Sequence, residues 1–322
     1  MAIFHSSILQ KAKQGALAPK IIFIGLALLC LFPSVSPPLA LALGIGLAIV
    51  LGNPFTSYTH KATHFLLQAS VVGLGFGMNI HSAIATGKSA FSFTLLSISI
   101  TFGIGFWLTK LLRIEKVTAY LIAAGTAICG GSAIAAVAPV VQAKENQTSI
   151  ALATVFVLNA VALFVFPPLG HWLNLSQNQF GYWCAIAIHD TSSVVGAASR
   201  YGAEALTVAT TVKLARALWI IPISLLSAFV FKGNTAKIKI PYFIGLFVLA
   251  MLLNSYLPQI QLYSHYITAW AKAGLTLTLF LIGSGLSLKV IRSVGMKPLV
   301  LGITLWLVIS VVALGVIKEF NI

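Results

Sequence analysis

The sequence predicts an all-α polytopic membrane protein with about 11 transmembrane helices. Of its 322 residues, 59% are hydrophobic and only 8% are charged, whereas soluble domains carry roughly 25% charged residues. Apolar stretches long enough to span a bilayer recur along the whole chain, and most basic residues lie in the short segments between them. This composition excludes a nucleic-acid binder, a cytosolic enzyme and a disordered chain, so no nucleic-acid partner is expected.

Each predicted span is an apolar stretch bounded by polar, Pro or Gly residues. Residues 1–19 form a predicted cytoplasmic or interfacial segment, and residues 20–322 form one transmembrane domain whose loops are too short to hold a soluble domain. The spans are 20–36, 38–54, 62–80, 90–109, 117–142, 149–167, 180–198, 205–231, 241–257, 266–288 and 298–317.

The positions of Lys and Arg predict the orientation of the chain. With the N-terminus inside, the inner segments hold most of the 20 Lys and Arg, and the outer segments hold only Lys88, Lys144, Arg200 and Lys318. Cytoplasmic loops of membrane proteins carry such an excess of basic residues. The net charge of +15 therefore indicates topology rather than an acidic partner.

The spans can be divided into one extra helix and two five-helix halves, and an odd number of helices inverts the second half relative to the first. The predicted repeats cover about 38–170 and about 180–318. One register pairs Gly130-Gly131-Ser132 with Gly283-Ser284-Gly285, whereas a rival register pairs Gly75 and Gly77 with Gly283 and Gly285. We prefer the first because it pairs whole helices, but the sequence leaves both open.

A Gly-rich motif, Gly125-Thr126-Ala127-Ile128-Cys129-Gly130-Gly131-Ser132-Ala133, lies inside the span 117–142. Two adjacent glycines weaken a helix by about 1 kcal/mol each, so we expect a break here. A half-helix that begins after a break presents free N–H groups and favours an anion. The alternative is close packing of small residues between helices. The candidate binding residues of this motif and of its counterpart in the tenth span are Thr126, Cys129, Gly130, Gly131, Ser132, Gly283 and Ser284.

The most polar run of any apolar stretch is Ile188-His189-Asp190-Thr191-Ser192-Ser193, in the span 180–198. Asp190 lies about ten residues into this span, roughly 15 Å deep at about 1.5 Å per residue. A charge at that depth costs at least ~2.5 kcal/mol on insertion scales, and it marks a functional position. The alternative is a polar cluster with a structural role alone. The candidate binding residues are His189, Asp190, Ser192 and Ser193.

Lys213 and Arg216 lie at a similar depth in the span 205–231. Their i, i+3 spacing places both on one helix face, which we expect to face the protein or a polar cavity rather than lipid. One carboxylate cannot neutralise two cations, so the surplus charge favours an incoming anion. Arg216 could bind an oxyanion with its planar guanidinium while Lys213 adds a point charge. Alternatively, either side chain extends to the interface or pairs with Asp190.

Other groups carry weaker signals. His189 is a candidate proton carrier, or a hydrogen-bonded packing residue. Intramembrane amides and hydroxyls could line a path or bond between helices. No C-x-x-C pair or metal-ligand spacing accompanies the three cysteines, so no disulfide, metal or other cofactor is expected. The amides and hydroxyls are Gln68, Asn79, Asn159 and Thr276.

Three segments together resemble the sulfate exporter family of bacterial inner-membrane proteins. They are residues 125–139, the run Ile188-His189-Asp190, and Val212-Lys213-Leu214-Ala215-Arg216 followed by Pro222. The resemblance covers nearly the whole chain. It implies the inverted-repeat fold of sodium/proton antiporters and bile acid symporters, with two crossing broken helices interrupted near residues 129–132 and 283–287. Where family members read Ile-His-Glu-Val-Ala-Gln, this chain reads Ile188-His189-Asp190-Thr191-Ser192-Ser193, which points to a different substrate within the family.

These features predict a secondary active transporter of a small anion, namely sulfate or an organic sulfonate or carboxylate, that works by alternating access in the bacterial inner membrane. The alternative is a cation/proton antiporter in which Asp190 binds the ion and Lys213 or Arg216 displaces it. An intramembrane enzyme is not expected, because no ordered nucleophile and base accompany His189 and Ser192. The expected partners are the anion and the lipid bilayer, while H+ or Na+ coupling and homodimer formation stay open.

Overall fold

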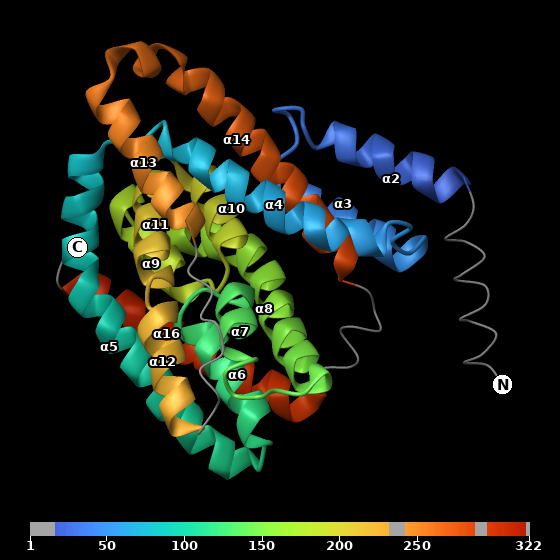
Figure 1. Cartoon of the computed structure of the whole chain (residues 1–322), viewed down its shortest axis with the longest axis vertical. Helices are drawn as coiled ribbons and strands as arrows, with labels where there is room; N and C mark the ends of the chain where they lie inside the picture. Colours follow the sequence, from blue (N-terminus) through green and yellow to red (C-terminus); the bar gives the residue numbers. More distant parts are fainter. Residues whose placement is uncertain (1–16, 232–241, 287–294, 320–322) are drawn as a thin grey trace. The chain divides into compact units, whose positions relative to one another are not determined.

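The structure is a computed structural model that describes residues 17–231, 242–286 and 295–319 (Figure 1). Every regular element in these ranges is a helix, which confirms the predicted all-α class. The chain divides into two compact units. Unit 1 comprises Met1–Asn79 and Gly245–Val290, and unit 2 comprises Ile80–Ile244 and Ile291–Ile322.

Unit 1 is organised around one long helix, α14, which packs along α3 and α4 and also contacts α2. Its core joins Phe23 of α2 to Leu47 of α3 and Phe280 of α14. Two prolines occupy the first turn of α3, where the missing N–H of proline leaves no helical bond unmade. The helices are α2 (Leu17–Leu29), α3 (Pro37–Val50), α4 (Thr56–Gly75), α13 (Tyr242–Tyr256, in this unit from Gly245) and α14 (Pro258–Gly285).

The contact between α3 and α14 depends on two glycines. A Cβ atom added to Gly44 would lie 2.2 Å from the carbonyl oxygen of Phe280, and one added to Gly283 would lie 2.4 Å from that of Leu41. The two backbones therefore touch directly, as small residues allow in membrane helices.

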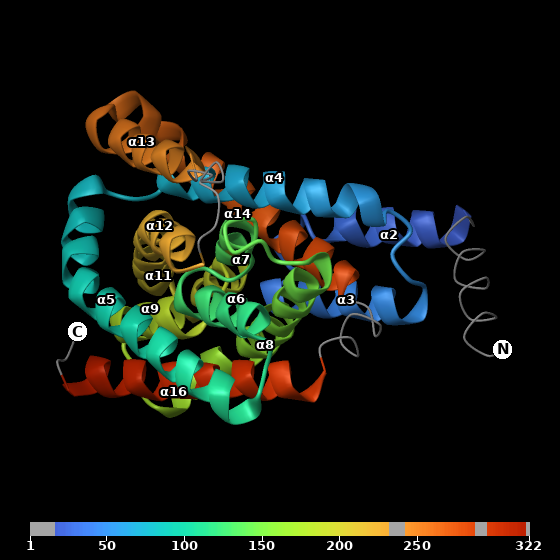
Figure 2. The same ribbon diagram turned by 60° about the horizontal axis from the view of Figure 1, so that its bottom comes forward.

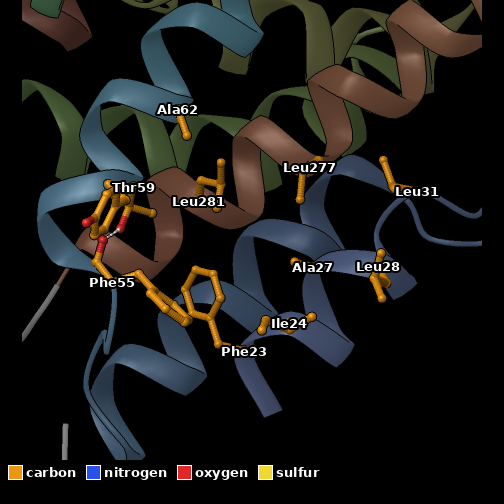
Figure 3. A pocket seen from close by; sticks show the side chains of 11 residues that line it. Phe23, Ile24, Ala27, Leu28, Leu31, Phe55, Thr59, Ala62, Leu277 and Leu281 are labelled. Carbon is orange, nitrogen blue, oxygen red and sulfur yellow. Dashed lines mark hydrogen bonds between the residues drawn. The ribbon is translucent and has the colours of Figure 1, made fainter. Parts of the chain in front are cut away.

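An apolar groove of about 280 Å³ lies in unit 1 between α2, the start of α4 and α14 (Figure 3). Its polar lining groups are Tyr58 and Thr59, and the Thr59 hydroxyl donates to the carbonyl oxygen of Phe55 at 2.5 Å. A groove without a charged side chain suits an acyl chain better than an anion. The residues drawn in Figure 3 include Phe23, Ile24, Ala27, Leu28, Leu31, Phe55, Ala62, Leu277 and Leu281.

Unit 2 encloses α6, which packs against α5, α7, α8 and α16. Leu121 and Ile122 of α6 are fully buried with Val155 of α8 and Leu305 of α16. In Figure 2, α16 runs along the lower edge of this unit, where it also packs against α9. The helices are α5 (Ile80–Leu112), α6 (Lys116–Ala127), α7 (Gly131–Val137), α8 (Glu145–Trp172), α9 (Gln177–Ala187), α10 (Thr191–Tyr201), α11 (Ala203–Ala217), α12 (Ile220–Val230) and α16 (Met296–Glu319).

Each predicted span coincides with a helix or with two consecutive helices, within several residues at each end. Five helical stretches in the described residues are long and apolar enough to cross a membrane: Ala90–Leu112, Glu145–Trp172, Ala203–Val230, Pro258–Gly285 and Met296–Glu319. Helices α2, α3 and α13 are shorter and apolar. The chain is therefore a multi-pass membrane protein, while 11 crossings and inverted repeats stay predictions. Several cations that the sequence predicts on the inner side lie outside the described residues, among them Lys232, Lys237, Lys239, Lys289 and Arg292.

Candidate functional site

The Gly-rich motif interrupts a helix, as predicted. Helix α6 ends at Ala127 and α7 begins at Gly131. Between them, Gly130 has φ 66° and ψ −128°, a left-handed backbone conformation that favours glycine. The interruption therefore falls at residues 128–130, at the start of the predicted interval. Ser132 lies one residue into α7 and is exposed, so it does not join the buried groups described below.

A second interruption lies where a continuous span was predicted. Helix α9 ends at Ala187 and α10 begins at Thr191, with Ile188 and Asp190 in extended conformations. No glycine marks this break, but Asp190 is the N-cap of α10, and Asp is among the residues preferred there. That N-cap preference, applied to the Asp190-Thr191-Ser192-Ser193 run, is the sequence signal that could have located the break.

The two interruptions are in direct contact within unit 2. A Cβ atom added to Gly130 would lie 3.2 Å from Cβ of Asp190 and 3.3 Å from its Cα and N atoms. Gly130 therefore provides both the backbone conformation of the first break and the space for the second. The structure thus has a pair of broken helices, α6–α7 and α9–α10, at one place.

Arg216 of α11 binds the C-terminal ends of the helices that precede both breaks. Its Nε atom donates to the carbonyl oxygen of Ala127 at 2.7 Å, and Nη2 donates to that of Thr126 at 3.3 Å. Nη1 donates to the carbonyl oxygen of Ile186 at 2.6 Å. The last carbonyls of a helix have no partner within that helix. Arg216 supplies partners for three of them and is 0% exposed.

Lys213 performs the same role for the second break alone. Its Nζ atom donates to the carbonyl oxygen of Ile188 at 2.6 Å and to that of Ala185 at 3.2 Å. The side chain is 0% exposed. The predicted inward face of this helix is confirmed, and neither cation reaches toward the interface.

Asp190 does not pair with these cations. Its carboxylate accepts the backbone N–H of Ser193 at 3.3 and 3.4 Å and a hydrogen bond from the hydroxyl of Ser192. All hydrogen bonds that the structure gives to Lys213 and Arg216 end on main-chain carbonyls. The predicted structural alternative, a pairing of Asp190 with Lys213 or Arg216, is therefore wrong for this conformation.

The charges are arranged according to the helix dipoles. A helix end carries about half an elementary charge, positive at the N-terminus and negative at the C-terminus. The two cations lie at the negative ends of α6 and α9, and Asp190 lies at the positive end of α10. The negative ends together offset about one of the two positive charges. The negative charge of Asp190 offsets the positive N-terminal ends of α7 and α10, the helices that begin after the breaks. About one positive charge is left over.

Several buried polar atoms near the breaks have no hydrogen-bond partner. They are both ring nitrogens of His189, Nδ2 of Asn159 and the hydroxyl of Thr126. Asn159 lies on α8, and its Oδ1 atom accepts the backbone N–H of His189 at 3.0 Å. These side chains are at most 3% exposed. Leaving such a group unpaired costs about 1–3 kcal/mol, so a ligand or water is the expected partner.

The remaining predicted site residues divide between the two units. Cys129, in the first break, is 3% exposed and carries a free thiol. Gly283 and Ser284 belong to unit 1 and are helical, since α14 continues to Gly285, and residues 287–294 lie outside the described residues. The Ser284 hydroxyl accepts from Nδ2 of Asn53 at 3.1 Å. The contacts of Gly283 with α3 therefore favour a role in close helix packing.

The residues in and beside the two interruptions are Thr126, Cys129, Gly130, Asn159, His189, Asp190, Ser192, Ser193, Lys213 and Arg216. In the sequence, Asn159 is only one of several intramembrane polar groups. The main-chain carbonyls that hold the cations carried no sequence signal, because every residue has one.

Comparison with known proteins gives the family of this chain. A family model described as "Conserved hypothetical protein 698" matches residues 19–302. A UPF0324 membrane protein of Bacteroides thetaiotaomicron is 53% identical over 288 residues, covering 88% of this chain and 86% of the relative. One of Photobacterium profundum is 52% identical over 308 residues, covering 95% and 94%. No solved structure matches. These matches show that the protein belongs to the UPF0324 family of membrane proteins.

Proposed function

We propose that this protein is a secondary active transporter of a small anion in the bacterial inner membrane, with its N-terminus in the cytoplasm, and not an enzyme. The observation that carries the proposal is the complete burial of Lys213 and Arg216 beside two interrupted helices. Transporters use interrupted helices to form substrate sites near the middle of the bilayer.

The charge balance supports an anion as substrate. Neither cation has a carboxylate partner, and the helix ends offset only about one of the two positive charges. An uncompensated charge in a low-dielectric interior is costly, and a bound anion offsets it. The resemblance to sulfate exporters favours sulfate, an organic sulfonate or a carboxylate.

Asp190 argues against the second candidate, a cation/proton antiporter. In the described structure the Asp190 carboxylate caps α10 and accepts hydrogen bonds from Ser192 and Ser193, a role that competes with binding of an ion. H+ or Na+ remains the coupling ion that we propose for anion transport.

Reconstitution of the purified protein into liposomes tests the proposal. We expect saturable uptake of labelled sulfate, methanesulfonate or acetate, and exchange of labelled for unlabelled anion. Lys213→Met keeps the length of the side chain but removes its charge, so uptake should fall at least tenfold, roughly 1.4 kcal/mol of binding. Lys213→Arg should retain part of the activity. The control is Arg200→Ala, which removes an exposed cation at the end of α10 and should leave uptake unchanged.

Two results would overturn the proposal. One is a sodium-driven pH change that does not depend on any anion, which would favour the antiporter. The other is anion flux that neither saturates nor shows exchange, which would indicate a channel. Size-exclusion chromatography of each variant before reconstitution separates loss of transport from loss of folding.

A further inference from the structure

We propose that Asn159 and His189 form the direct hydrogen-bonding contact for an oxygen atom of the transported anion, with Lys213 and Arg216 acting as positioning residues. This inference rests on the proposed function and deepens it, because it names which side chains touch the substrate.

Unpartnered polar atoms gather beside the two breaks. Seven buried side-chain nitrogen or oxygen atoms in the described residues lack a hydrogen-bond partner, and four of them belong to Thr126, Asn159 and His189. Thr126 immediately precedes the end of α6, and His189 lies inside the second break. Buried polar groups in native proteins are almost always paired. These unpaired groups beside two touching helix breaks offer hydrogen-bond partners to a ligand bound there.

The unpartnered atom of Asn159 determines which chemical group can bind it. The backbone N–H of His189 can only donate, so the Asn159 atom 3.0 Å away must be the oxygen. The unpartnered atom of Asn159 is therefore its amide nitrogen, which has two N–H donors and no acceptor capacity. Such a group requires an acceptor.

The two cations already have partners at the breaks. The three nitrogen atoms of Arg216 and Nζ of Lys213 donate to carbonyls at the two breaks. These bonds fix the broken helices and leave a positive potential around them. Asn159, in contrast, lies on the continuous 28-residue helix α8, which offers a rigid base for a contact that must discriminate between anions.

The decisive substitution is Asn159→Asp in the full-length protein. Aspartate has nearly the same shape and keeps an acceptor for the backbone N–H of His189, but it replaces the amide donor with a negatively charged oxygen. We expect the apparent KM for sulfate, methanesulfonate or acetate uptake to rise at least tenfold. The anion that raises the unfolding midpoint of the wild type should no longer do so.

Thr154→Val is the matched control, because Thr154 is also buried on α8 but its hydroxyl donates to the carbonyl oxygen of Ile150 at 2.8 Å. Its KM and its anion-induced shift should match the wild type. If Asn159→Asp does not purify as a monodisperse protein, Asn159→Ala and His189→Gln provide the same KM measurement.

The outcomes separate the two proposals. If wild-type protein neither binds nor transports any of the three anions, the proposed function fails, and this inference fails with it. If the wild type transports an anion and the Asn159 variants show an unchanged KM, with or without a lower maximal rate, Asn159 has a structural role only. The contact is then disproved while the transport function stands.

Discussion

The two glycine-containing segments that the sequence pairs as counterparts use their glycines differently. In unit 2, Gly130 takes a positive φ and the helix breaks beside it. In unit 1, Gly283 lies in the last turn of α14, which ends at Gly285, and its missing side chain lets that helix touch α3. Glycine permits both outcomes. The two segments differ in the hydrogen-bond donors that neighbouring side chains offer to main-chain carbonyls freed by a break.

At the broken segment, Arg216 supplies donors for the freed carbonyls of Thr126 and Ala127. A break inside a membrane is tolerated only when such partners exist. Next to Gly283, Asn53 donates to the hydroxyl of Ser284, which donates in turn to the carbonyl oxygen of Leu281. Within the part of the chain that the structure describes, a long basic side chain on a neighbouring helix therefore distinguishes the two segments better than glycine content does.

Arg216→Leu should have the largest effect on stability. It removes the donors of three buried carbonyls, and hydrogen bonds to charged groups are worth about 1.5–3 kcal/mol each. We expect a loss of at least about 3 kcal/mol in unfolding free energy. The loss should appear as a lower thermal midpoint in detergent. Arg200→Leu, at an exposed position, should change the stability by less than about 0.5 kcal/mol. Equal midpoints for the two variants would mean that Arg216 does not hold the breaks together.

Gly283→Ala should produce the next largest loss. The new Cβ atom would lie 2.4 Å from the carbonyl oxygen of Leu41 and 3.0 Å from the backbone nitrogen of Ile45. Backbone atoms cannot rotate away, so we expect a loss of about 1–3 kcal/mol from overpacking. Gly285→Ala, with nothing within 4 Å of the added carbon, is the control on the same helix. A stabilised Gly283→Ala protein would contradict the direct contact between α3 and α14.

Gly130→Ala tests the broken counterpart of the same comparison. Here the neighbouring atoms of Asp190 are 3.2–3.3 Å from the new carbon, so the overlap is mild. The cost comes mainly from the backbone conformation, and a non-glycine residue in such a region loses about 1–3 kcal/mol. We expect a loss of unfolding free energy in the lower half of that range, seen as a lower unfolding midpoint, together with slower anion uptake. Uptake equal to the wild type would show that the break geometry is not needed for transport.

The sequence was sufficient for those features that depend on hydrophobicity and on a residue's own backbone preference. Apolar stretches located every helix, and the Gly-rich motif located the first break. The second break was missed because its cause is an N-cap, Asp190, inside an otherwise apolar run. From hydropathy alone, one polar residue in an apolar run is interpreted as part of a single span, and not as the start of a new helix.

The partners of Lys213 and Arg216 could not be predicted for a different reason. A search for charge partners in a sequence finds carboxylates, and Asp190 was the candidate at the right depth. The actual partners are main-chain carbonyls at the helix interruptions. These carbonyls are free to accept from a side chain only because the helices are interrupted there. The balance of charge at this site is therefore a property of the fold, and no single side chain in the sequence reveals it.

Thr126→Val should have the smallest effect on stability and the opposite sign. The Thr126 hydroxyl is buried without a partner, beside the carbonyl that binds Arg216. Valine has nearly the same shape, and removing an unsatisfied hydroxyl should stabilise the ligand-free protein by about 1 kcal/mol. If the hydroxyl contributes to anion binding, the same variant should bind the anion more weakly.

Ser224→Ala is the control for Thr126→Val: it removes an unpartnered hydroxyl on α12 and should stabilise the protein without changing anion binding. A thermal-unfolding series with and without sulfate, methanesulfonate or acetate measures both quantities. Destabilisation by Thr126→Val would mean that its hydroxyl already has a partner, such as a buried water, in the resting protein.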